Sequence, residues 1–570
     1  MSFLNKEVTD GMKKLFRSRK ELLKALLFSF SGGVLFAAAL PPLNWWWAGF
    51  FALAPLVWCA ARMEWKRAAL CGWVWGLGWS LFAFQFLREI EFIVPYLLAP
   101  VISVWPAVAA GLISGTGRRL LYTPEGMAED SEKQPSYLSE RLPWYRTLLF
   151  IFCAAVIYTL AEWTRSRLFT WNDLSVTQWR NLPFIQICSV TGSYGVLFLT
   201  ALGGAALGSV TLRYGRHCLA GVLLLLLGNW FWGYHQLNNV PYVTDREWKT
   251  APVQGDLSQR RHAGEKEFRE ALETYIKLSY DAAKLDPSVI IWPESAIPMP
   301  LRSSHPFALE YAAALKKLIV DCRKPMLIGA LDFSPPPPGK KEYGFTNSAL
   351  YIEGNWVLRY KYDKIHRVPY GEYIPFRHLL PEFLIRMIDM GRDLTSGTNM
   401  ETLDLPGGPK VSTAICYEGV FGYLTRQFAF KGAEVLTVLS NDAWYPRSSE
   451  PEQHLANALM RAVETGVPML RCGNNGGTGV VDPRGRLLGF LDVPDQPGRR
   501  EIKRGRAAGI VTVRYKASPE KTFYVRHGEW FILFLGLLFA GLLGTALITR
   551  LRYCSKLPES GFILRKRHRS

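Results

Sequence analysis

One cysteine in the C-terminal half of the chain has the surroundings expected of a nucleophile. A run of small and β-branched residues at 411–415 ends at Cys416, and Tyr417, Glu418 and a glycine follow directly. This pattern predicts a buried strand that delivers one thiol to the mouth of a pocket through a sharp turn. A thiol attacks acyl carbon readily once a base has removed its proton. A buried cysteine is ordinarily a core residue, so the interpretation depends on partner groups elsewhere in the chain.

A candidate base follows an earlier apolar run. Residues 290–298 read IIWPESAIP, so a predicted strand ends at Trp292 and presents Glu294. Burial against tryptophan can raise the pKa of a carboxylate into the range of a general base. A carboxylate after a strand is more commonly a helix cap or a surface group, and only its combination with Cys416 favours catalysis.

A candidate cation lies between these two stretches. Residues 362–375 read YDKIHRVPYGEYIP, in which Lys364 follows a predicted strand and Glu372 stands in a loop held by prolines and a glycine. A lysine at this place can bind the oxyanion of a tetrahedral intermediate. Glu372 can position the lysine or take part in proton transfer. Three groups suited to acyl chemistry therefore each follow a strand, in the order Glu294, Lys364, Cys416.

The elements that must position these groups alternate between strands and helices. Helices are expected at 264–285, 307–321, 421–431 and 452–465. Short strands are expected at 289–292, 325–329, 348–352, 356–360, 411–415, 435–439, 469–471 and 510–513. Alternation of this kind predicts a layered α/β domain with buried strands. We place this domain at residues 246–516.

The first part of the chain has a different character. Apolar stretches run over residues 25–40, 45–61, 68–87, 92–115, 147–160, 192–212 and 218–234, and an eighth covers 530–548. Each approaches the roughly 20 residues that a membrane-spanning helix needs. Tryptophans stand near the ends of several stretches, as in an interfacial aromatic belt. The pattern predicts a polytopic α-helical membrane domain with seven spans at 25–240 and a C-terminal transmembrane helix at 529–549.

Positive charge indicates the orientation. Basic residues precede the first predicted span and recur in alternate connections, whereas the intervening short connections carry little positive charge. The positive-inside rule then places both termini, the basic arm 1–24 and the basic tail 550–570, in the cytoplasm. It also places the segment 123–142 in a cytoplasmic loop and the α/β domain on the outer face. The tryptophan-rich connection 162–184 lies on that face, either as an interfacial loop or as one that contacts a lipid headgroup or substrate.

Composition excludes several other classes of protein. The chain has 570 residues and a formal net charge of +19. Since the basic residues flank predicted spans, membrane topology explains the charge and nucleic acid is not expected as a partner. The nine cysteines contain no CxxC pair, which argues against a zinc site or a disulfide framework. No metal or organic cofactor is implied, because the three groups suffice for acyl transfer.

Taken together, these motifs resemble the nitrilase, or carbon–nitrogen hydrolase, superfamily, and within it the bacterial apolipoprotein N-acyltransferases. The resemblance rests on WPES around Glu294, YDKxHxVPYGEY around Lys364 and CYEG at Cys416. VQGD at 253–256, SNDAW at 440–444, QHL at 453–455 and RCGNNG at 471–476 match as well. So does the order of seven spans, outer domain and final span. The resemblance implies an αββα four-layer sandwich for the α/β domain and a bacterial inner-membrane location with that domain on the periplasmic side.

The resemblance also implies a ping-pong acyl transfer. Glu294 would take the thiol proton, and the Cys416 thiolate would attack the sn-1 ester of a phospholipid, typically phosphatidylethanolamine. Lys364 would stabilise the oxyanion together with a backbone N–H near Tyr417. The thioester would then pass its acyl chain to the N-terminal amine of diacylglyceryl-cysteine on an apolipoprotein, the last step of lipoprotein maturation. Glu372, Tyr417 and Glu418 would support the triad.

Three further residues in these motifs have a simpler explanation. Asn441, His454 and Arg471 are expected to make the hydrogen bonds of a loop, a turn and a strand end. Two rival functions stay open. One is a membrane-tethered amidase or nitrilase that hydrolyses a small substrate with the same triad. The other is a transporter or lipid-binding scaffold with an inactive outer domain, which would not need Glu294, Lys364 or Cys416.

Overall fold

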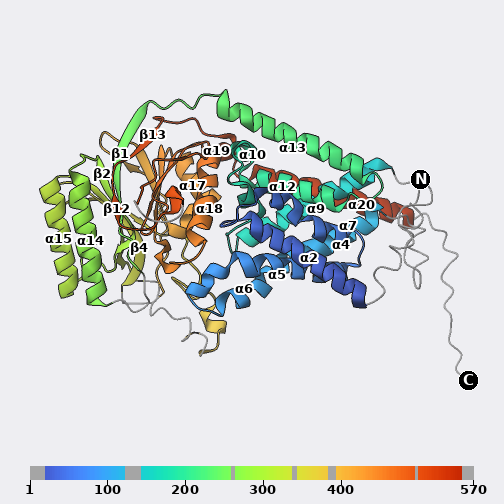
Figure 1. Ribbon diagram of the computed structural model, residues 1–570, viewed down its shortest axis with the longest axis horizontal. Helices are drawn as coiled ribbons and strands as arrows, with labels where there is room; N and C mark the ends of the chain where they lie inside the picture. Colours follow the sequence, from blue (N-terminus) through green and yellow to red (C-terminus); the bar gives the residue numbers. More distant parts are fainter. Residues whose placement is uncertain are drawn as a thin grey trace, which may run out of the picture.

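The computed structural model describes residues 19–121, 143–258, 264–336, 343–382, 385, 393–493 and 499–554. Most of the basic arm, the whole loop 123–142 and most of the basic tail lie outside these described residues. Figure 1 shows the described chain as two lobes side by side, a helical lobe and a lobe built on β-sheets. The predicted nucleophile, Cys416, lies in the sheet-based lobe, directly after one of its strands.

The first sheet of the second lobe has seven strands in the order β12-β1-β2-β3-β4-β5, with β13 also paired to β1. Strands β1, β2 and β3 run parallel, whereas β4 and β5 continue as antiparallel neighbours. The strands are β1 (Arg246–Gln254), β2 (Val289–Ile297), β3 (Met326–Ser334), β4 (Gly344–Ile352), β5 (Leu358–Asp363), β12 (Ala507–Ala508) and β13 (Val511–Tyr515). The sequence did not predict β1, although it is the strand from which the sheet extends on both sides.

The second sheet has six strands in the order β11-β10-β9-β8-β7-β6. Its centre is parallel, from β7 through β8 to β9, and both edges are antiparallel. The strands are β6 (Leu403–Asp404), β7 (Lys410–Ile415), β8 (Val435–Ser440), β9 (Met469–Gly473), β10 (Gly479–Val481) and β11 (Leu487–Leu488). Every residue of β8 and β9 is buried, as expected for parallel strands covered on both faces.

Two helices cover the outer face of each sheet. Helices α14 (Glu265–Ala283) and α15 (Pro306–Cys322) pack on the first sheet, where Tyr275 stacks on Trp292 with ring centroids 5.0 Å apart. Helices α17 (Gly422–Phe430) and α18 (Glu450–Thr465) pack on the second. Figure 1 shows this order of layers, with α18 facing the helical lobe. The predicted αββα sandwich is therefore confirmed.

The helical lobe contains apolar helices at each of the predicted stretches. They are α2 (Arg19–Ala39), α3 (Gly49–Ala52), α4 (Ala54–Ala60), α5 (Trp65–Ala83), α6 (Val94–Ile102), α7 (Val104–Leu121), α9 (Trp144–Ser166), α12 (Ser193–Gly208), α13 (Gly215–Asn238) and α20 (Trp530–Cys554). The short helices α10 (Leu182–Ile185), α11 (Cys188–Thr191) and α19 (Phe523–His527) lie outside those stretches. Leucines on α13 and α20 are exposed, with Leu224 at 71% and Leu537 at 65%. Exposed leucines on long apolar helices are stable against lipid chains, not against water.

Four helices among the described residues are long and apolar enough to cross a membrane. They are α2, the run 94–121 formed by α6 and α7, α9 and α13. Shorter apolar helices cover Trp46–Ala60, Leu182–Thr191, Ser193–Gly208 and Trp530–Leu542. The chain is thus a membrane protein, whereas the number of eight spans and the domain limits drawn from sequence stay predictions.

Candidate active site

The predicted nucleophile stands on a sharp backbone turn. Strand β7 ends at Ile415, and Cys416 opens a short 3₁₀ helix, Cys416–Val420. The φ angle of Cys416 is +51°, in the left-handed region that non-glycine residues seldom adopt. This turn directs the thiol away from the line of the strand at the carboxyl end of β7. Burial raises the pKa of the Cys416 thiol well above its ordinary value, with the Glu294 charge adding to this effect and Lys364 opposing it. The resting group is therefore a thiol that needs a base.

Lys364 joins the two predicted carboxylates in one buried cluster. Its ammonium lies 3.0 Å from Oε1 of Glu294 and 2.9 Å from Oε1 of Glu372. Only 1% of the lysine side chain is exposed. Burial alone would lower the pKa of Lys364, but Glu294 and Glu372 outweigh it and hold the pKa well above its ordinary value. Lys364 is thus a permanent positive charge in a site that lies beside Cys416.

Asn347 completes this cluster, and the sequence analysis missed it. Its Nδ2 donates to Glu294 at 2.7 Å and to Glu372 at 3.0 Å, so it bridges the same two oxygens as the lysine. The backbone carbonyl oxygen of Asn347 accepts a hydrogen bond from the backbone N–H of Lys364 at 2.8 Å. The antiparallel register of β4 with β5 accounts for this. Ser348 pairs with Asp363, so the residue before Ser348, Asn347, lies close to the residue after Asp363, Lys364. Sequence spacing alone carries no signal for such a cross-strand partner.

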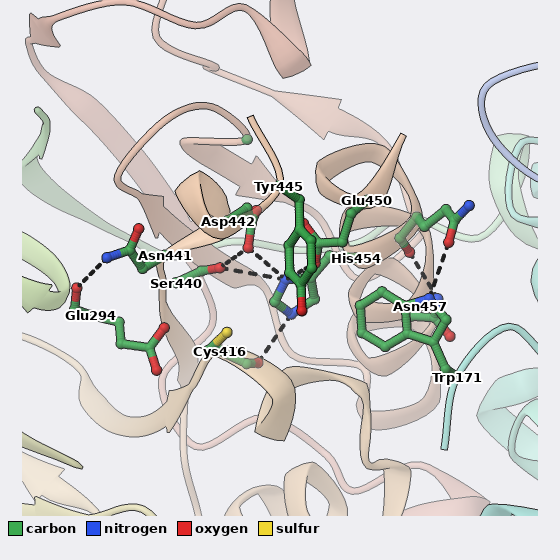
Figure 2. Close-up of polar contacts among 12 residues, drawn as sticks. Trp171, Glu294, Cys416, Ser440, Asn441, Asp442, Tyr445, Glu450, His454 and Asn457 are labelled. Carbon is green, nitrogen blue, oxygen red and sulfur yellow. Dashed lines mark hydrogen bonds and ion pairs between the residues drawn. The ribbon is translucent and has the colours of Figure 1, made fainter. Parts of the chain in front are cut away.

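Glu294 lies inside a strand, not after one as predicted. Strand β2 runs on to Ile297, but its pairing with β3 is interrupted between Trp292 and Ile297, and Ser295 has a φ angle of +53°. This irregularity turns the Glu294 side chain toward the interior of the site. Figure 2 shows the Glu294 carboxylate facing the Cys416 sulfur. The backbone oxygen of Glu294 accepts a hydrogen bond from Nδ2 of Asn441 at 3.4 Å.

Glu418 ties the lysine loop to the nucleophile turn. One carboxylate oxygen accepts the backbone N–H groups of Ile365 at 2.7 Å and His366 at 3.0 Å, and the Tyr362 hydroxyl at 2.9 Å. The other oxygen accepts the backbone N–H of Ile415 at 2.8 Å. Burial raises the pKa of Glu418 to about 7, although these backbone donors act to lower it. The fully buried side chain thus links the segment that follows Lys364 to the residue that precedes Cys416.

A loop of the helical lobe reaches this turn. The backbone N–H of Thr170, just after α9, donates to the Tyr417 hydroxyl at 3.1 Å. The next residue, Trp171, donates its indole N–H to Gln453 on α18 at 3.1 Å and lies 6.1 Å from the Tyr417 ring. Asn172 donates to Gln453 at 2.7 Å. The predicted outer loop 162–184 therefore contacts the neighbour of the nucleophile directly.

A buried polar network stands behind Cys416. Asp442 accepts a hydrogen bond from Arg471 and lies 3.0 Å from Nδ1 of His454, while Nε2 of His454 lies 3.0 Å from the Cys416 carbonyl oxygen. Burial acts to raise the pKa of Asp442, but the Arg471 guanidinium together with His454 and the Ser440 hydroxyl outweighs it and lowers that pKa well below its usual range. Figure 2 shows Asp442 and His454 of this network on the side of Cys416 opposite Glu294.

The same network has the elements of a metal site but not the arrangement. The Cys416 sulfur, an Asp442 oxygen and a His454 nitrogen lie within 4.8 Å of one another. Both imidazole nitrogens already have partners, and Nη2 of Arg471 lies 3.1 Å from Nδ1 of His454 and also binds Asp442. A guanidinium at this position is a poor neighbour for a second cation. The donor set thus suits hydrogen bonding, with Asn441 and Arg471 holding a loop and a strand end as predicted.

The sandwich and its cysteine define a class of enzyme. A family model described as carbon–nitrogen hydrolase matches residues 249–494, and a second, described as the apolipoprotein N-acyltransferase N-terminal domain, matches residues 32–206. The sheet-based lobe is accordingly a carbon–nitrogen hydrolase domain. With both models matched in this order over most of its length, the chain belongs to the apolipoprotein N-acyltransferase family.

Curated relatives cover nearly the whole chain. The apolipoprotein N-acyltransferase of Geobacter metallireducens is 28% identical over 90% of this chain and 92% of its own length. That of Allorhizobium ampelinum is 27% identical over 93% of this chain and 96% of its own. Among solved structures, an amidase from Nesterenkonia sp. AN1 aligns over 50% of this chain and 96% of its own, with 16% identity and a TM-score of 0.34.

Proposed function

We propose that this membrane-bound acyltransferase moves a fatty acyl chain from a phospholipid, phosphatidylethanolamine by preference, to the N-terminal amine of diacylglyceryl-cysteine on apolipoproteins. The observation that carries the proposal is the hydrogen bond of Thr170, in the helical lobe, to Tyr417, beside the partly buried Cys416 thiol. A thiol at the junction of a lipid-facing lobe and a carbon–nitrogen hydrolase domain is suited to two lipid substrates. The names of the relatives support the same acceptor.

In the first half-reaction Glu294 takes the Cys416 proton as the sulfur attacks the ester carbonyl. Lys364 and the backbone N–H of Tyr417 bind the oxyanion of the tetrahedral intermediate. Collapse breaks the ester C–O bond, and the protonated Glu294 returns its proton to the leaving alcohol. The products are a lysophospholipid and a thioester on Cys416.

In the second half-reaction the lipoprotein amine attacks the thioester carbonyl. Glu294 accepts the amine proton, the same donors bind the second oxyanion, and the C–S bond breaks as the amide forms. The proton returns to the Cys416 sulfur. Lys364 keeps its positive charge throughout, because two carboxylates share it. No step calls for a group beyond these side chains and the two substrates.

The proposal includes a location. The basic residues flanking the predicted spans support an arrangement in the bacterial inner membrane with both termini in the cytoplasm and the hydrolase domain on the periplasmic face. Seven spans at 25–240 and one at 529–549 belong to the same proposal, with the catalytic domain at 246–516. Apolipoproteins and the outer-leaflet phospholipid would then meet the thiol on one side of the membrane.

The experiment follows the second half-reaction. Acyl-enzyme freed of excess phospholipid is mixed with a dipalmitoylglyceryl-cysteine peptide, and with the same peptide acetylated at its amine. The proposal expects transfer of the acyl chain to the free amine and retention of the thioester with the acetylated peptide. Hydrolysis at equal rates with both peptides would favour a membrane-tethered carbon–nitrogen hydrolase that uses water as acceptor.

A further inference from the structure

A histidine outside the predicted triad holds the main chain of the nucleophile. His454 lies in the first turns of α18, is fully buried, and points Nε2 at the Cys416 carbonyl oxygen 3.0 Å away. A carbonyl oxygen only accepts, so Nε2 carries the hydrogen of this bond. The carbonyl belongs to the residue with the left-handed φ angle, which sets the direction of the peptide that joins Cys416 to Tyr417.

The opposite side of the imidazole ring is held in place. Nδ1 lies 3.0 Å from Asp442 Oδ1 and 3.1 Å from Arg471 Nη2, and Ser440 Oγ is 3.4 Å away. One face of the ring packs near Trp171 of the helical lobe, with ring centroids 5.5 Å apart. The contacts of Nδ1 and the packing against Trp171 fix the orientation of the imidazole ring. Nε2 therefore stays directed at the Cys416 carbonyl oxygen.

The geometry of the peptide bond converts this anchor into an orientation. In a planar trans peptide the C=O and the following N–H point in opposite directions. Figure 2 shows the Cys416 carbonyl directed at His454, with Glu294 on the other side of the cysteine. The N–H of Tyr417 is therefore directed to the side of Glu294, where the Lys364 ammonium lies 3.0 Å from the Glu294 carboxylate. The two donors that an oxyanion needs then share one side of the thiol.

We infer that His454 is a positioning residue for acyl transfer: by holding the Cys416 carbonyl, it aims the Tyr417 N–H at the oxyanion. The inference deepens the proposed function and rests on it for the role of that N–H. Neither the charge of Glu294 nor its access to the thiol depends on His454. Loss of the anchor should therefore slow reactions that pass through an oxyanion and spare those that do not.

Two amide substitutions at His454 test the contributions of the two ring nitrogens separately. The amide nitrogen of asparagine comes close to the position of Nδ1, and that of glutamine close to the position of Nε2. His454→Asn therefore keeps a donor to Asp442 and loses the one to the Cys416 carbonyl. His454→Gln restores a donor to the carbonyl. Both variants are polar and similar in volume, so they serve as matched partners.

The experiment compares two reactions of Cys416 in the full-length protein in detergent. Acylation by p-nitrophenyl butyrate passes through an oxyanion and needs no phospholipid, whereas alkylation by iodoacetamide passes through none. We expect His454→Asn to slow acylation about 100-fold, the cost of one oxyanion donor, with alkylation within about 3-fold of the wild type. His454→Gln should acylate within about 10-fold of the wild type.

Three results would overturn the inference. They are acylation by His454→Asn at the wild-type rate, acylation and alkylation slowed in equal proportion, and His454→Gln as slow as His454→Asn. The small ester keeps this test separate from the proposed function. Failure of the wild type to react with phosphatidylethanolamine would contradict the proposed donor while the comparison of the two amides would still decide the role of His454.

Discussion

The backbone N–H of Thr170 donates to the hydroxyl of Tyr417 at 3.1 Å, which joins the loop after α9 to the residue beside the nucleophile. The two residues are far apart in sequence and belong to different lobes. The hydrolase domain of this chain is thus built against its membrane lobe at the reaction centre itself. This relationship makes a phospholipid donor more natural than a small soluble amide.

Tyr417→Phe should affect the phospholipid reaction selectively. It removes the acceptor of the Thr170 N–H and leaves that donor partly buried, at a cost of ~1–2 kcal/mol. We expect acylation by phosphatidylethanolamine to fall about 10-fold and acylation by p-nitrophenyl butyrate to stay within about 3-fold, measured as single-turnover rates. Tyr370→Phe, at an exposed tyrosine, is the control. An equal loss with both donors would show that the hydroxyl acts at the reacting atoms.

Glu294→Gln should change the pH dependence of thiol reactivity. Because burial holds the pKa of the Cys416 thiol above its ordinary value, little thiolate is present at neutral pH without a base. Since burial is the largest cause of the shift, it persists in the variant. We expect alkylation of Cys416 at pH 7.5 to fall at least ~10-fold and then to rise with pH, without levelling off below about pH 8.5, the ordinary pKa of a thiol. Peptide mass spectrometry reports on this cysteine alone. A plateau near pH 7 would argue against Glu294 as the base.

Lys364→Met should damage both activity and stability. Two buried carboxylates, Glu294 and Glu372, would lose the cation that they share. Removal of one partner of a buried ion pair costs ~3–5 kcal/mol, so thermal unfolding in detergent should occur at a clearly lower temperature and acylation should be lost. Lys317→Met is the matched control, because that lysine is 73% exposed and its partner Asp321 is 40% exposed. Similar unfolding temperatures for the two variants would contradict the claim that Lys364 stabilises the two buried carboxylates.

Glu418→Gln should loosen the site without removing a reacting group. Glutamine has one acceptor oxygen, so either the N–H of Ile415 or those of Ile365 and His366 would lose a partner. An unpaired buried N–H costs ~1–3 kcal/mol. We expect slower acylation together with a lower unfolding temperature. Glu270→Gln breaks an exposed ion pair with Arg506 and should change neither measurement. Full activity of Glu418→Gln would remove this residue from the supporting set.

The strand pattern was enough to predict a layered α/β domain with three candidate groups at strand ends, and the resemblance to the nitrilase superfamily supplied the four-layer sandwich. Lys364 and Cys416 follow β5 and β7 directly, as the apolar runs before them indicated. Glu294 differs, because β2 continues past it through an irregular pairing with β3. A proline-containing run reads as a strand end in sequence, although here the strand bends and resumes.

Other parts of the site depend on packing that a sequence does not reveal. Asn347 meets Glu294 only because β4 and β5 pair in one register. His454 reaches the Cys416 carbonyl only because α18 packs on the second sheet with its first turns beside β7. The bond from Thr170 depends on how the two lobes dock. Each of these contacts joins residues that lie far apart along the chain, so no local sequence pattern indicates it.

The most direct test of the account is intact mass spectrometry of the purified protein after incubation with phosphatidylethanolamine, beside Cys416→Ser and Glu294→Gln. The account predicts one hydroxylamine-labile acyl adduct on the wild type, none on Cys416→Ser and a depleted amount on Glu294→Gln. A wild-type protein that gains no adduct while iodoacetamide still alkylates Cys416 would contradict the phospholipid thioester.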